Sequence, residues 1–240
     1  GYQLNNKGYQ LNNKGYQLNN KGYQLIYNNY NEFLKSKKPI ITLGGDHSIS
    51  SASCQAFIDK YKEKSHIIWI DAHTDINTPE TSNTQNTHGM PVASLMGLTK
   101  SNIVNKLYNL RHDQITYIGP RSIDPYELKF IQDNNIKLYS TNDIKNNINE
   151  IINEINEKIK NKYVHISYDI DVMDSKYINS TGTIEENGFN IEENMKIIEE
   201  ITKNNSIISA DFVELNLDLG NKEKSLKLMI DIINKFIINL

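Results

Sequence analysis

The chain has 240 residues and a net charge of −3. This length suffices for one large core, and the small net charge argues against bulk electrostatic binding to nucleic acid or to an anionic membrane. Cys54 is the single cysteine, so no disulfide can form within the chain, and we expect a cytoplasmic protein. No apolar run approaches the roughly 18 residues of a membrane-spanning helix, and no signal-peptide pattern is present.

The first 25 residues consist of the heptapeptide GYQLNNK three times, followed by GYQL. A seven-residue period can indicate a coiled coil, but the spacing from Tyr2 to Leu4 and then to Tyr9 does not alternate between three and four. A glycine in each copy weakens a helix further. We therefore predict a low-complexity, disordered segment over residues 1–25 and one folded catalytic domain over residues 26–240. The alternative for the repeat is an interaction segment.

Six short runs of β-branched and aromatic residues follow the repeat, and most of them end in Gly, Asp or another polar residue. They predict strands at 39–45, 66–72, 115–121, 136–140, 163–169 and 206–215. Helical patterns lie around them, at 26–38, 50–62, 126–134, 141–160, 191–203 and 222–238. This alternation predicts an α/β fold of three layers, in which helices cover both faces of a mostly parallel sheet.

Polar residues collect at the carboxyl ends of four predicted strands. The first strand leads into GGDHS, the second into DAHTDIN, the fifth into SYDIDVMD and the sixth into DFVEL. In a parallel sheet these ends meet at one edge, where ligands bind. The residues that we expect to gather there are His47, Asp71, His73, Asp75, Asp169, Asp171 and Glu214.

Four aspartates and two histidines in one crevice are costly as bare charges, because taking an ion out of water costs several kcal/mol. Two divalent cations would neutralise the four carboxylates. Asp and His ligands without a thiolate favour a hard or borderline metal such as Mn²⁺, with Zn²⁺ and Fe²⁺ as alternatives. One Asp-x-Asp pair alone more often forms a turn. The same chemistry at successive strand ends predicts a metal centre that activates water as a nucleophile.

The motifs GGDHS, DAHTDIN and SYDIDVMD occur in this order within residues 39–240 and resemble the three metal motifs of the ureohydrolase superfamily, which includes arginase, agmatinase and formiminoglutamase. The resemblance implies an arginase-like fold and two Mn²⁺ ions. It implies that one ion binds to His47, Asp71, Asp75 and Asp169, and the other to Asp71, His73, Asp169 and Asp171. It also implies that Asp71 and Asp169 bridge the ions and that Asp75 orients the bridging hydroxide.

Within this superfamily, the stretch NTHGMPVASLMG at residues 86–97 resembles arginase in particular. His88 in this stretch matches the histidine that passes a proton to the leaving amine, which suits an imidazole because its pKa lies near neutrality. The implied substrate contacts are Asn77, Thr84 and Asn86 with the α-carboxylate, Asp124 with the α-amino group, and Glu214 and Thr183 with the guanidinium. A carboxylate is the expected complement of that planar cation.

The resemblance thus implies a manganese hydrolase of arginine metabolism that converts L-arginine to L-ornithine and urea, the urea cycle reaction, by hydroxide attack on the guanidinium carbon. A homotrimer or hexamer is part of the same implication. Two alternatives stay open. One is hydrolysis of agmatine or another guanidino compound, and the other is a truncated, inactive chain that acts as an interaction module.

The chain departs from the family pattern in three places. Asp174-Ser175 stands where family members usually have Asp-Pro, and Asn187-Gly188 stands in place of Gly-Gly. Arginases also carry a strand before the first metal motif, whereas only 38 residues precede Pro39 here. We therefore expect the sheet to lack that N-terminal strand, which leaves a neighbouring strand with an unpaired edge.

Overall fold

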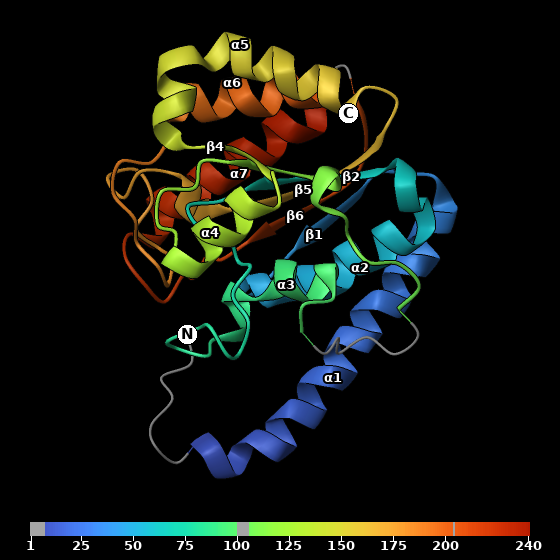
Figure 1. Ribbon diagram of the computed structural model, residues 1–240. Helices are drawn as coiled ribbons and strands as arrows, with labels where there is room; N and C mark the ends of the chain where they lie inside the picture. The colour runs from blue at the N-terminus through green and yellow to red at the C-terminus, as the bar shows by residue number, and fades with distance from the viewer. Residues whose placement is uncertain (1–7, 100–105, 204) are drawn as a thin grey trace.

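The computed structural model describes residues 8–99, 106–203 and 205–240, with side chains from residue 21 onward (Figure 1). Within this part of the chain, six parallel strands form one sheet in the order β1-β6-β5-β2-β3-β4. The strands are β1 (Ile40–Leu43), β2 (Ser65–Ile70), β3 (Ile115–Ile118), β4 (Lys137–Tyr139), β5 (Tyr163–Asp169) and β6 (Ser206–Val213). Each lies inside or within one residue of a predicted strand, so the strand predictions are confirmed.

Helices cover both faces of the sheet, which confirms the predicted three-layer α/β fold. One layer contains α5 (Thr141–Ile159), α6 (Ile191–Thr202) and α7 (Lys222–Ile238), drawn above the sheet in Figure 1. The other layer contains α1 (Gly8–Phe33), α2 (Ser50–Tyr61), α3 (Pro91–Met96) and α4 (Pro125–Asp133). None of the described helices combines the length and the apolar character that crossing a membrane requires.

The central strand β2 separates two hydrophobic cores. Ile68 and Ile70 pack in the core beneath α5, α6 and α7, whereas Ile67 and Trp69 pack on the side of α1, α2 and α3. Successive residues of a strand point to opposite faces, so a strand buried on both faces has apolar residues on both. This doubly packed strand is a rigid support for Asp71, which directly follows it.

Helix α1 begins at Gly8, inside the repeat, whereas the sequence predicts a disordered segment over residues 1–25. Tyr23 of the last repeat copy joins Tyr27, Tyr30 and Leu34 in one buried stripe at helical spacing. The stripe packs against α2, and Tyr27 Oη donates a hydrogen bond to Asp59 Oδ2 at 2.7 Å. The repeat by itself gives no sign of this stripe, because residues downstream of the repeat complete it. The prediction for residues 1–7 lies outside the described residues.

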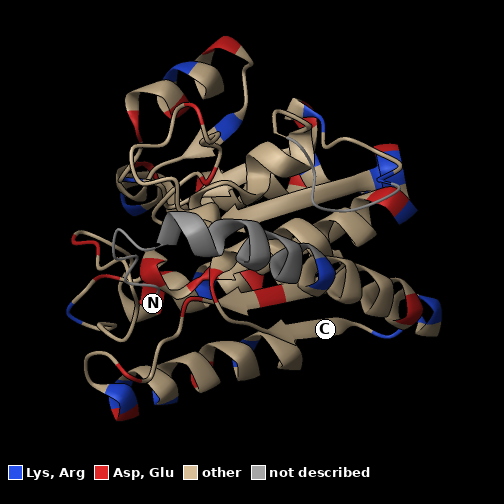
Figure 2. Ribbon diagram, turned by 90° about the horizontal axis from the view of Figure 1, so that it is seen from below, with Lys and Arg blue, Asp and Glu red and all other residues tan. Residues whose placement is uncertain are grey.

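Strand β1 pairs within the described residues with β6 alone, so it forms an edge of the sheet. Its last residue, Leu43, is 70% exposed. This is the unpaired edge that we expected next to the first metal motif. In the ribbon seen from below, the described Lys and Arg residues are interspersed with Asp and Glu residues along helices and loops (Figure 2).

Candidate functional site

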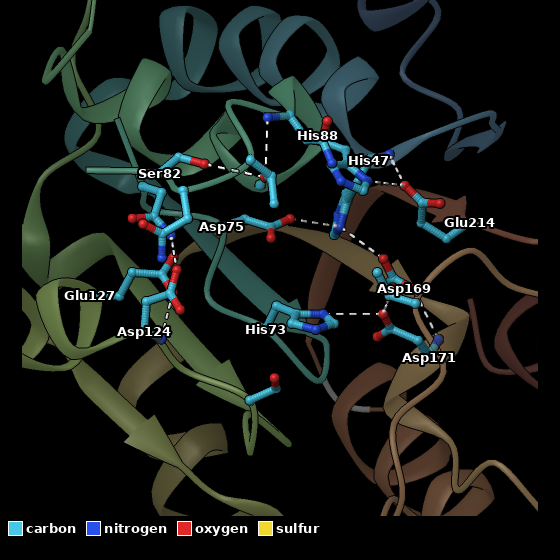
Figure 3. A pocket seen from close by; sticks show the side chains of 17 residues that line it. His47, His73, Asp75, Ser82, His88, Asp124, Glu127, Asp169, Asp171 and Glu214 are labelled. Atoms are coloured by element: carbon cyan, nitrogen blue, oxygen red, sulfur yellow. Dashed lines mark hydrogen bonds and ion pairs between the residues drawn. The ribbon is translucent and has the colours of Figure 1, made fainter. Parts of the chain in front are cut away.

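The carboxyl ends of β1, β6, β5 and β2 lie side by side, because these strands are consecutive neighbours in the sheet. A cavity of about 240 Å³ opens above them (Figure 3). It is lined by twelve of the predicted site residues, namely His47, His73, Asp75, Asn77, Thr84, Asn86, His88, Asp124, Asp169, Asp171, Thr183 and Glu214. The remaining one, Asp71, is fully buried beside them. The fold therefore brings every predicted site residue to one place.

His47 is the centre of a first cluster of polar atoms. It starts the short 3-10 helix after β1, and its ring stacks on Trp69 with 4.2 Å between the ring centroids. Its Nδ1 lies 3.0 Å from Asp71 Oδ2, 3.1 Å from Asp75 Oδ2 and 3.2 Å from Asp169 Oδ2. All four polar residues are buried, and Nδ1 makes no hydrogen bond of acceptable geometry.

The hydrogen bonds behind His47 indicate which ring nitrogen carries the proton. Ser167 Oγ donates to Ser50 Oγ at 3.2 Å, so it accepts from His47 Nε2 at 2.8 Å. Ser50 Oγ in turn donates to Asp211 Oδ2 at 2.9 Å. In the neutral ring, Nδ1 then presents a lone pair to three carboxylates. This arrangement is repulsive unless a cation lies among them, so the donor set fits a divalent metal ion.

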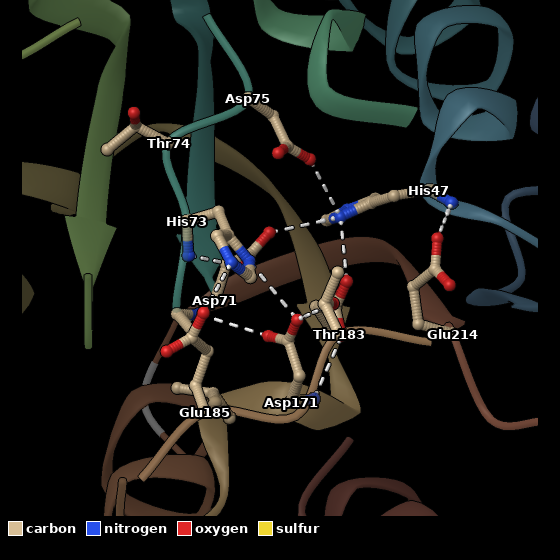
Figure 4. Close-up of polar contacts among 12 residues, drawn as sticks. His47, Asp71, His73, Thr74, Asp75, Asp171, Thr183, Glu185 and Glu214 are labelled. Atoms are coloured by element: carbon tan, nitrogen blue, oxygen red, sulfur yellow. Dashed lines mark hydrogen bonds and ion pairs between the residues drawn. The ribbon is translucent and has the colours of Figure 1, made fainter. Parts of the chain in front are cut away.

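His73 and Asp171 form a second cluster together with Asp71 (Figure 4). His73 Nδ1 lies 3.1 Å from Asp171 Oδ2 and 3.4 Å from Asp71 Oδ1. Asp71 thus turns Oδ2 toward His47 and Oδ1 toward His73. One carboxylate shared by two imidazole clusters is the arrangement that two neighbouring ions require. The second cluster therefore fits a second metal ion beside the first.

Burial and mutual repulsion raise the pKa of three of the four aspartates. Burial and the neighbouring Asp71 raise the pKa of Asp75 to about 7. Burial, followed by the charges of Asp171 and Asp71, raises the pKa of Asp169, and burial and Asp71 raise the pKa of Asp171. Burial also acts to raise the pKa of Asp71, but its close contacts with the imidazoles of His47 and His73 lower it. Two divalent ions would remove the repulsion that these shifts reflect.

Backbone N–H groups hold the carboxylates in position. His73 N donates to Asp71 Oδ1 at 2.7 Å, and Asp171 N donates to Asp169 Oδ1 at 2.9 Å. Ala72 N donates across to Asp171 Oδ1 at 3.2 Å and so connects the segments after β2 and β5. In both segments, an aspartate at the strand end accepts from the residue two positions later. The one-residue spacing in the motifs is therefore also the spacing of a tight turn.

Glu214 and His88 lie close together at one end of the cavity (Figure 3). His88 Nδ1 is 3.5 Å from Glu214 Oε1, and the same oxygen accepts a hydrogen bond from His47 N at 2.7 Å. The interaction with Glu214 raises the pKa of His88, although burial opposes this. Burial acts to raise the pKa of Glu214, but its bonds with His88 and the His47 backbone lower it. Glu214 is therefore an anion at neutral pH.

The remaining predicted substrate contacts lie around the cavity rim. Asn77 Nδ2 donates to Asp124 Oδ2 at 2.8 Å, and Asn86 N donates to Thr84 Oγ1 at 3.3 Å. Thr183, which we expect to contact the guanidinium, also lines the cavity, and its Oγ1 donates to Asp171 Oδ2 at 2.7 Å. The hydroxyl of Thr183 thus contacts the second cluster.

Several residues of the site were not identified from the sequence. Trp69 Nε1 donates to Asp71 Oδ2 at 3.0 Å, yet in the sequence Trp69 reads as an apolar strand residue. Glu127 is buried and accepts from Ile76 N and Asp124 N, which ties α4 to the segment after β2. Further lining residues that were not predicted are Ser82, Asn83, Gly89 and Ser122. A capping box at the start of α4 was the one sequence signal for Glu127.

Comparison with known sequences finds a match to the family model described as Arginase family over residues 7–238. The arginase of Plasmodium berghei is 38% identical over 209 residues, which are 83% of this chain and 59% of that protein. The arginase of Saccharomyces cerevisiae is 35% identical over 212 residues, which are 81% of this chain and 62% of that protein. The chain thus spans less than two thirds of the length of either relative.

Solved structures show the same relationship. Entamoeba histolytica arginase in complex with L-ornithine has a TM-score of 0.84 at 30% identity, covering 90% of this chain and 74% of that one. Arginase from Bacillus subtilis has a TM-score of 0.85 at 31% identity, covering 90% of this chain and 78% of that one. These similarities confirm the predicted arginase-like fold.

Proposed function

Because this chain belongs to the arginase family, we propose that it is a binuclear metal hydrolase that converts L-arginine to L-ornithine and urea. One observation carries the proposal: two histidine–aspartate clusters share Asp71 beneath a cavity that has Glu214 in its wall. The clusters support metal-dependent hydrolysis, and the partly buried anion of Glu214 supports a cationic substrate. The family supports arginine as that substrate.

We propose Mn²⁺ as the metal, because imidazole nitrogens and carboxylate oxygens without a thiolate favour a hard or borderline ion. The residues that would hold the two ions are His47, Asp71, Asp75 and Asp169 for one, and Asp71, His73, Asp169 and Asp171 for the other. When bound, such a pair supplies a water that is deprotonated at neutral pH and attacks an electrophilic carbon. In this proposal Asp75 orients that nucleophile, consistent with its place beside His47 Nδ1.

Glu214 is the proposed partner of the guanidinium group. The hydrogen bond from His47 N keeps one of its oxygens at the cavity wall beside the first cluster. A carboxylate binds a planar guanidinium through paired hydrogen bonds, and partial burial strengthens this interaction. His88 lies 3.5 Å from the same oxygen, so a guanidinium held by Glu214 has His88 within reach. We assign to His88 the role of donating a proton to the leaving amine.

The other end of an amino acid substrate would meet the opposite rim. Asn77, Thr84 and Asn86 supply the polar groups proposed for the α-carboxylate, and Asp124 supplies the anion for the α-amino group. Thr183 donates a hydrogen bond to Asp171 and would orient the Asp171 carboxylate below the guanidinium. Agmatine has no α-carboxylate, so it would leave the first three groups without a partner. This difference makes arginine the preferred substrate.

The proposal is tested by measuring urea and ornithine released from L-arginine by the purified, folded chain loaded with Mn²⁺. We expect urea release that disappears on chelation and returns with added Mn²⁺. A folded sample that holds two ions and releases no urea would contradict the proposal. A higher kcat/KM for agmatine than for arginine would change the substrate assignment, and agmatine is therefore measured in parallel.

Two aspartate variants after β5 test whether activity depends on the proposed ligand Asp171 or on negative charge in this segment in general. Asp171→Asn removes a proposed ligand, whereas Asp174→Asn changes a nearby aspartate whose ion-pair partner is the exposed Lys176. We expect Asp171→Asn to lower kcat/KM by roughly 100-fold or more and Asp174→Asn to retain most of the activity. Equal losses in the two variants would contradict the assigned role of Asp171.

A further inference from the structure

We propose that Glu185 positions the imidazole of His73, so that Nδ1 of that ring faces the second metal site. Glu185 lies outside the three metal motifs and does not line the substrate cavity. It would act through His73, without touching metal or substrate, and is therefore a positioning residue. This inference rests on the proposed function and deepens it by adding an outer partner to the metal centre.

The contact lies on the side of the ring away from the clustered aspartates. Glu185 Oε1 is 3.3 Å from His73 Nε2, while Nδ1 faces Asp171 and Asp71. Figure 4 shows Glu185 and Asp171 below the His73 ring, at its two sides. An imidazole that binds a metal through one nitrogen carries its proton on the other. An acceptor at Nε2 therefore selects the tautomer whose lone pair is on Nδ1.

His47 shows the same arrangement with a different acceptor. Its Nε2 is bonded to the buried hydroxyl of Ser167 at 2.8 Å, and its Nδ1 faces carboxylates. Each of the two imidazoles thus has an outer hydrogen-bond partner on Nε2 and acidic groups at Nδ1. The outer partner of His73 is a carboxylate. An imidazole that donates to a carboxylate is a stronger metal ligand than one that donates to a hydroxyl. We therefore expect Glu185 to matter for metal affinity at the second site.

Arg121 holds the backbone of the segment that carries Glu185. Its guanidinium donates to the main-chain oxygens of Glu185 at 3.1 Å and Glu186 at 2.8 Å. It also donates to the main-chain oxygens of Asp171 at 2.8 Å and Val172 at 3.2 Å. One side chain thus ties Glu185 to the loop that contains a proposed metal ligand. This attachment lowers the entropy cost of holding the partly exposed carboxylate against His73.

Glu186 provides a matched control for the charge of Glu185. It is the next residue, it has the same charge, and the same guanidinium holds its main-chain oxygen. Its side chain is exposed, and its carboxylate has no hydrogen bond or ion pair with any residue that the structure describes. Replacing Glu186 therefore removes a neighbouring negative charge and leaves the contact with His73 in place.

The test is Mn²⁺ binding, measured by titration calorimetry and by the electron paramagnetic resonance spectrum of the spin-coupled ion pair. We expect Glu185→Ala to lower the Mn²⁺ affinity of the second site by roughly 10-fold or more and to reduce the spin-coupled signal. Binding of the first ion should not change. Glu185→Gln keeps an acceptor oxygen without the charge, so its affinity should lie between those of Glu185→Ala and the wild type. Glu186→Ala and Glu186→Gln should match wild type within about twofold.

Two results would overturn the inference. One is an unchanged second site in both Glu185 variants, and the other is equal weakening by Glu185→Ala and Glu186→Ala, which would reflect charge alone. Thermal unfolding of each metal-free variant verifies that it folds, and Glu185→Gln serves if the alanine variant does not. A wild-type chain that binds no Mn²⁺ would instead refute the proposed metal centre. A wild-type chain with two ions and unaffected variants would refute only the role of Glu185.

Discussion

Asp75 and Glu214 share an unusual backbone conformation, with positive φ values of 50° and 64°. Non-glycine residues in this region carry strain on the order of 1–3 kcal/mol and collect at functional sites. Backbone contacts offset the strain here, because Val92 N donates to the Asp75 oxygen at 3.0 Å and Glu214 N donates to the Gly45 oxygen at 3.0 Å. Two proposed catalytic carboxylates are thus held in place at a cost in local conformational energy.

His66 leads to a prediction about pH and stability that does not involve the metal centre. It is buried in β2, and its Nε2 lies 3.0 Å from Thr116 Oγ1. Burial, and then the charges of Lys158 and Lys162, lower the pKa of His66 to about 3. Above pH ~6.5, His66 is neutral in both the folded and the unfolded state. Between pH ~6.5 and ~3, only the unfolded chain gains the proton, so the free energy of unfolding decreases as the pH is lowered.

We expect His66→Gln to flatten the decline of Tm between about pH 7 and about pH 5, because the loss from one such group reaches about 1.4 kcal/mol per pH unit. Thermal unfolding in the presence of a chelator measures this without metal release. The control is His112→Gln, which removes a partly exposed histidine and should keep the wild-type slope. If Tm of His66→Gln declines with falling pH as steeply as in the wild type, His66 does not exclude the proton in the folded state.

At the scale of whole elements, helix α1 shows how a repeat acquires structure from its neighbours. The repeat alone does not continue an apolar stripe, because its tyrosines recur every seven residues with glycine beside them. Tyr23 becomes part of a stripe only through Tyr27, Tyr30 and Leu34, which follow at helical spacing. The stripe then packs on α2, which starts just after His47. Tertiary packing therefore overrides the low helical propensity of the last repeat copy.

The segments after β3 and β5 are connected by Arg121. Its guanidinium donates to six main-chain oxygens, those of Gly119, Asp171, Val172, Met173, Glu185 and Glu186. We expect Arg121→Lys to lower the free energy of unfolding by roughly 2–4 kcal/mol, because an ammonium cannot reproduce this planar set of donors. Denaturation of the metal-free chain by urea measures the change.

Arg111, the only other arginine of the chain, is the control for this substitution. It pairs with Asp113 at 2.6 Å on the surface, where both side chains are more than half exposed. Arg111→Lys should change the free energy of unfolding by less than about 1 kcal/mol. If the two substitutions destabilise the chain equally, the hydrogen bonds of Arg121 do not hold these segments together.

At the scale of the whole molecule, metal binding should couple to stability. A ligand that binds only the folded state at 100 times its Kd adds about 2.7 kcal/mol, which for a domain of this size raises Tm by roughly 5–10 °C. We expect Mn²⁺ to produce such an increase and a chelator to reverse it. An unfolding transition that does not respond to Mn²⁺ would contradict the metal centre and favour an interaction module.

The same coupling depends on pH. Protons compete with metal ions for the carboxylates, and burial and Asp71 raise the pKa of Asp75 to about 7. Below this pKa Asp75 holds a proton that the metal must displace, and above it the carboxylate is free to bind. We therefore expect the increase of Tm at a fixed Mn²⁺ concentration to be larger at about pH 8 than at about pH 6. An equal or smaller increase at the higher pH would contradict this assignment.

Local patterns in the sequence determined the strands, most helices and the three-layer class. Apolar β-branched runs and helical periodicity are properties of neighbouring residues, so they can be recognised before the chain is folded. The residues of the site were identified for a related reason. Parallel strands place their carboxyl ends at one edge, so polar residues after β1, β2, β5 and β6 were expected to meet there.

The tertiary structure alone decided how those residues face one another. Asp71 turns one oxygen to each imidazole, Ser167 lies behind His47, and Glu185 lies behind His73. The last pair is separated by 112 positions in the chain and is brought together by loops that Arg121 ties to each other. Contacts of this kind depend on strand order and loop conformation, which arise from the packing of the whole chain and leave no local pattern in the sequence.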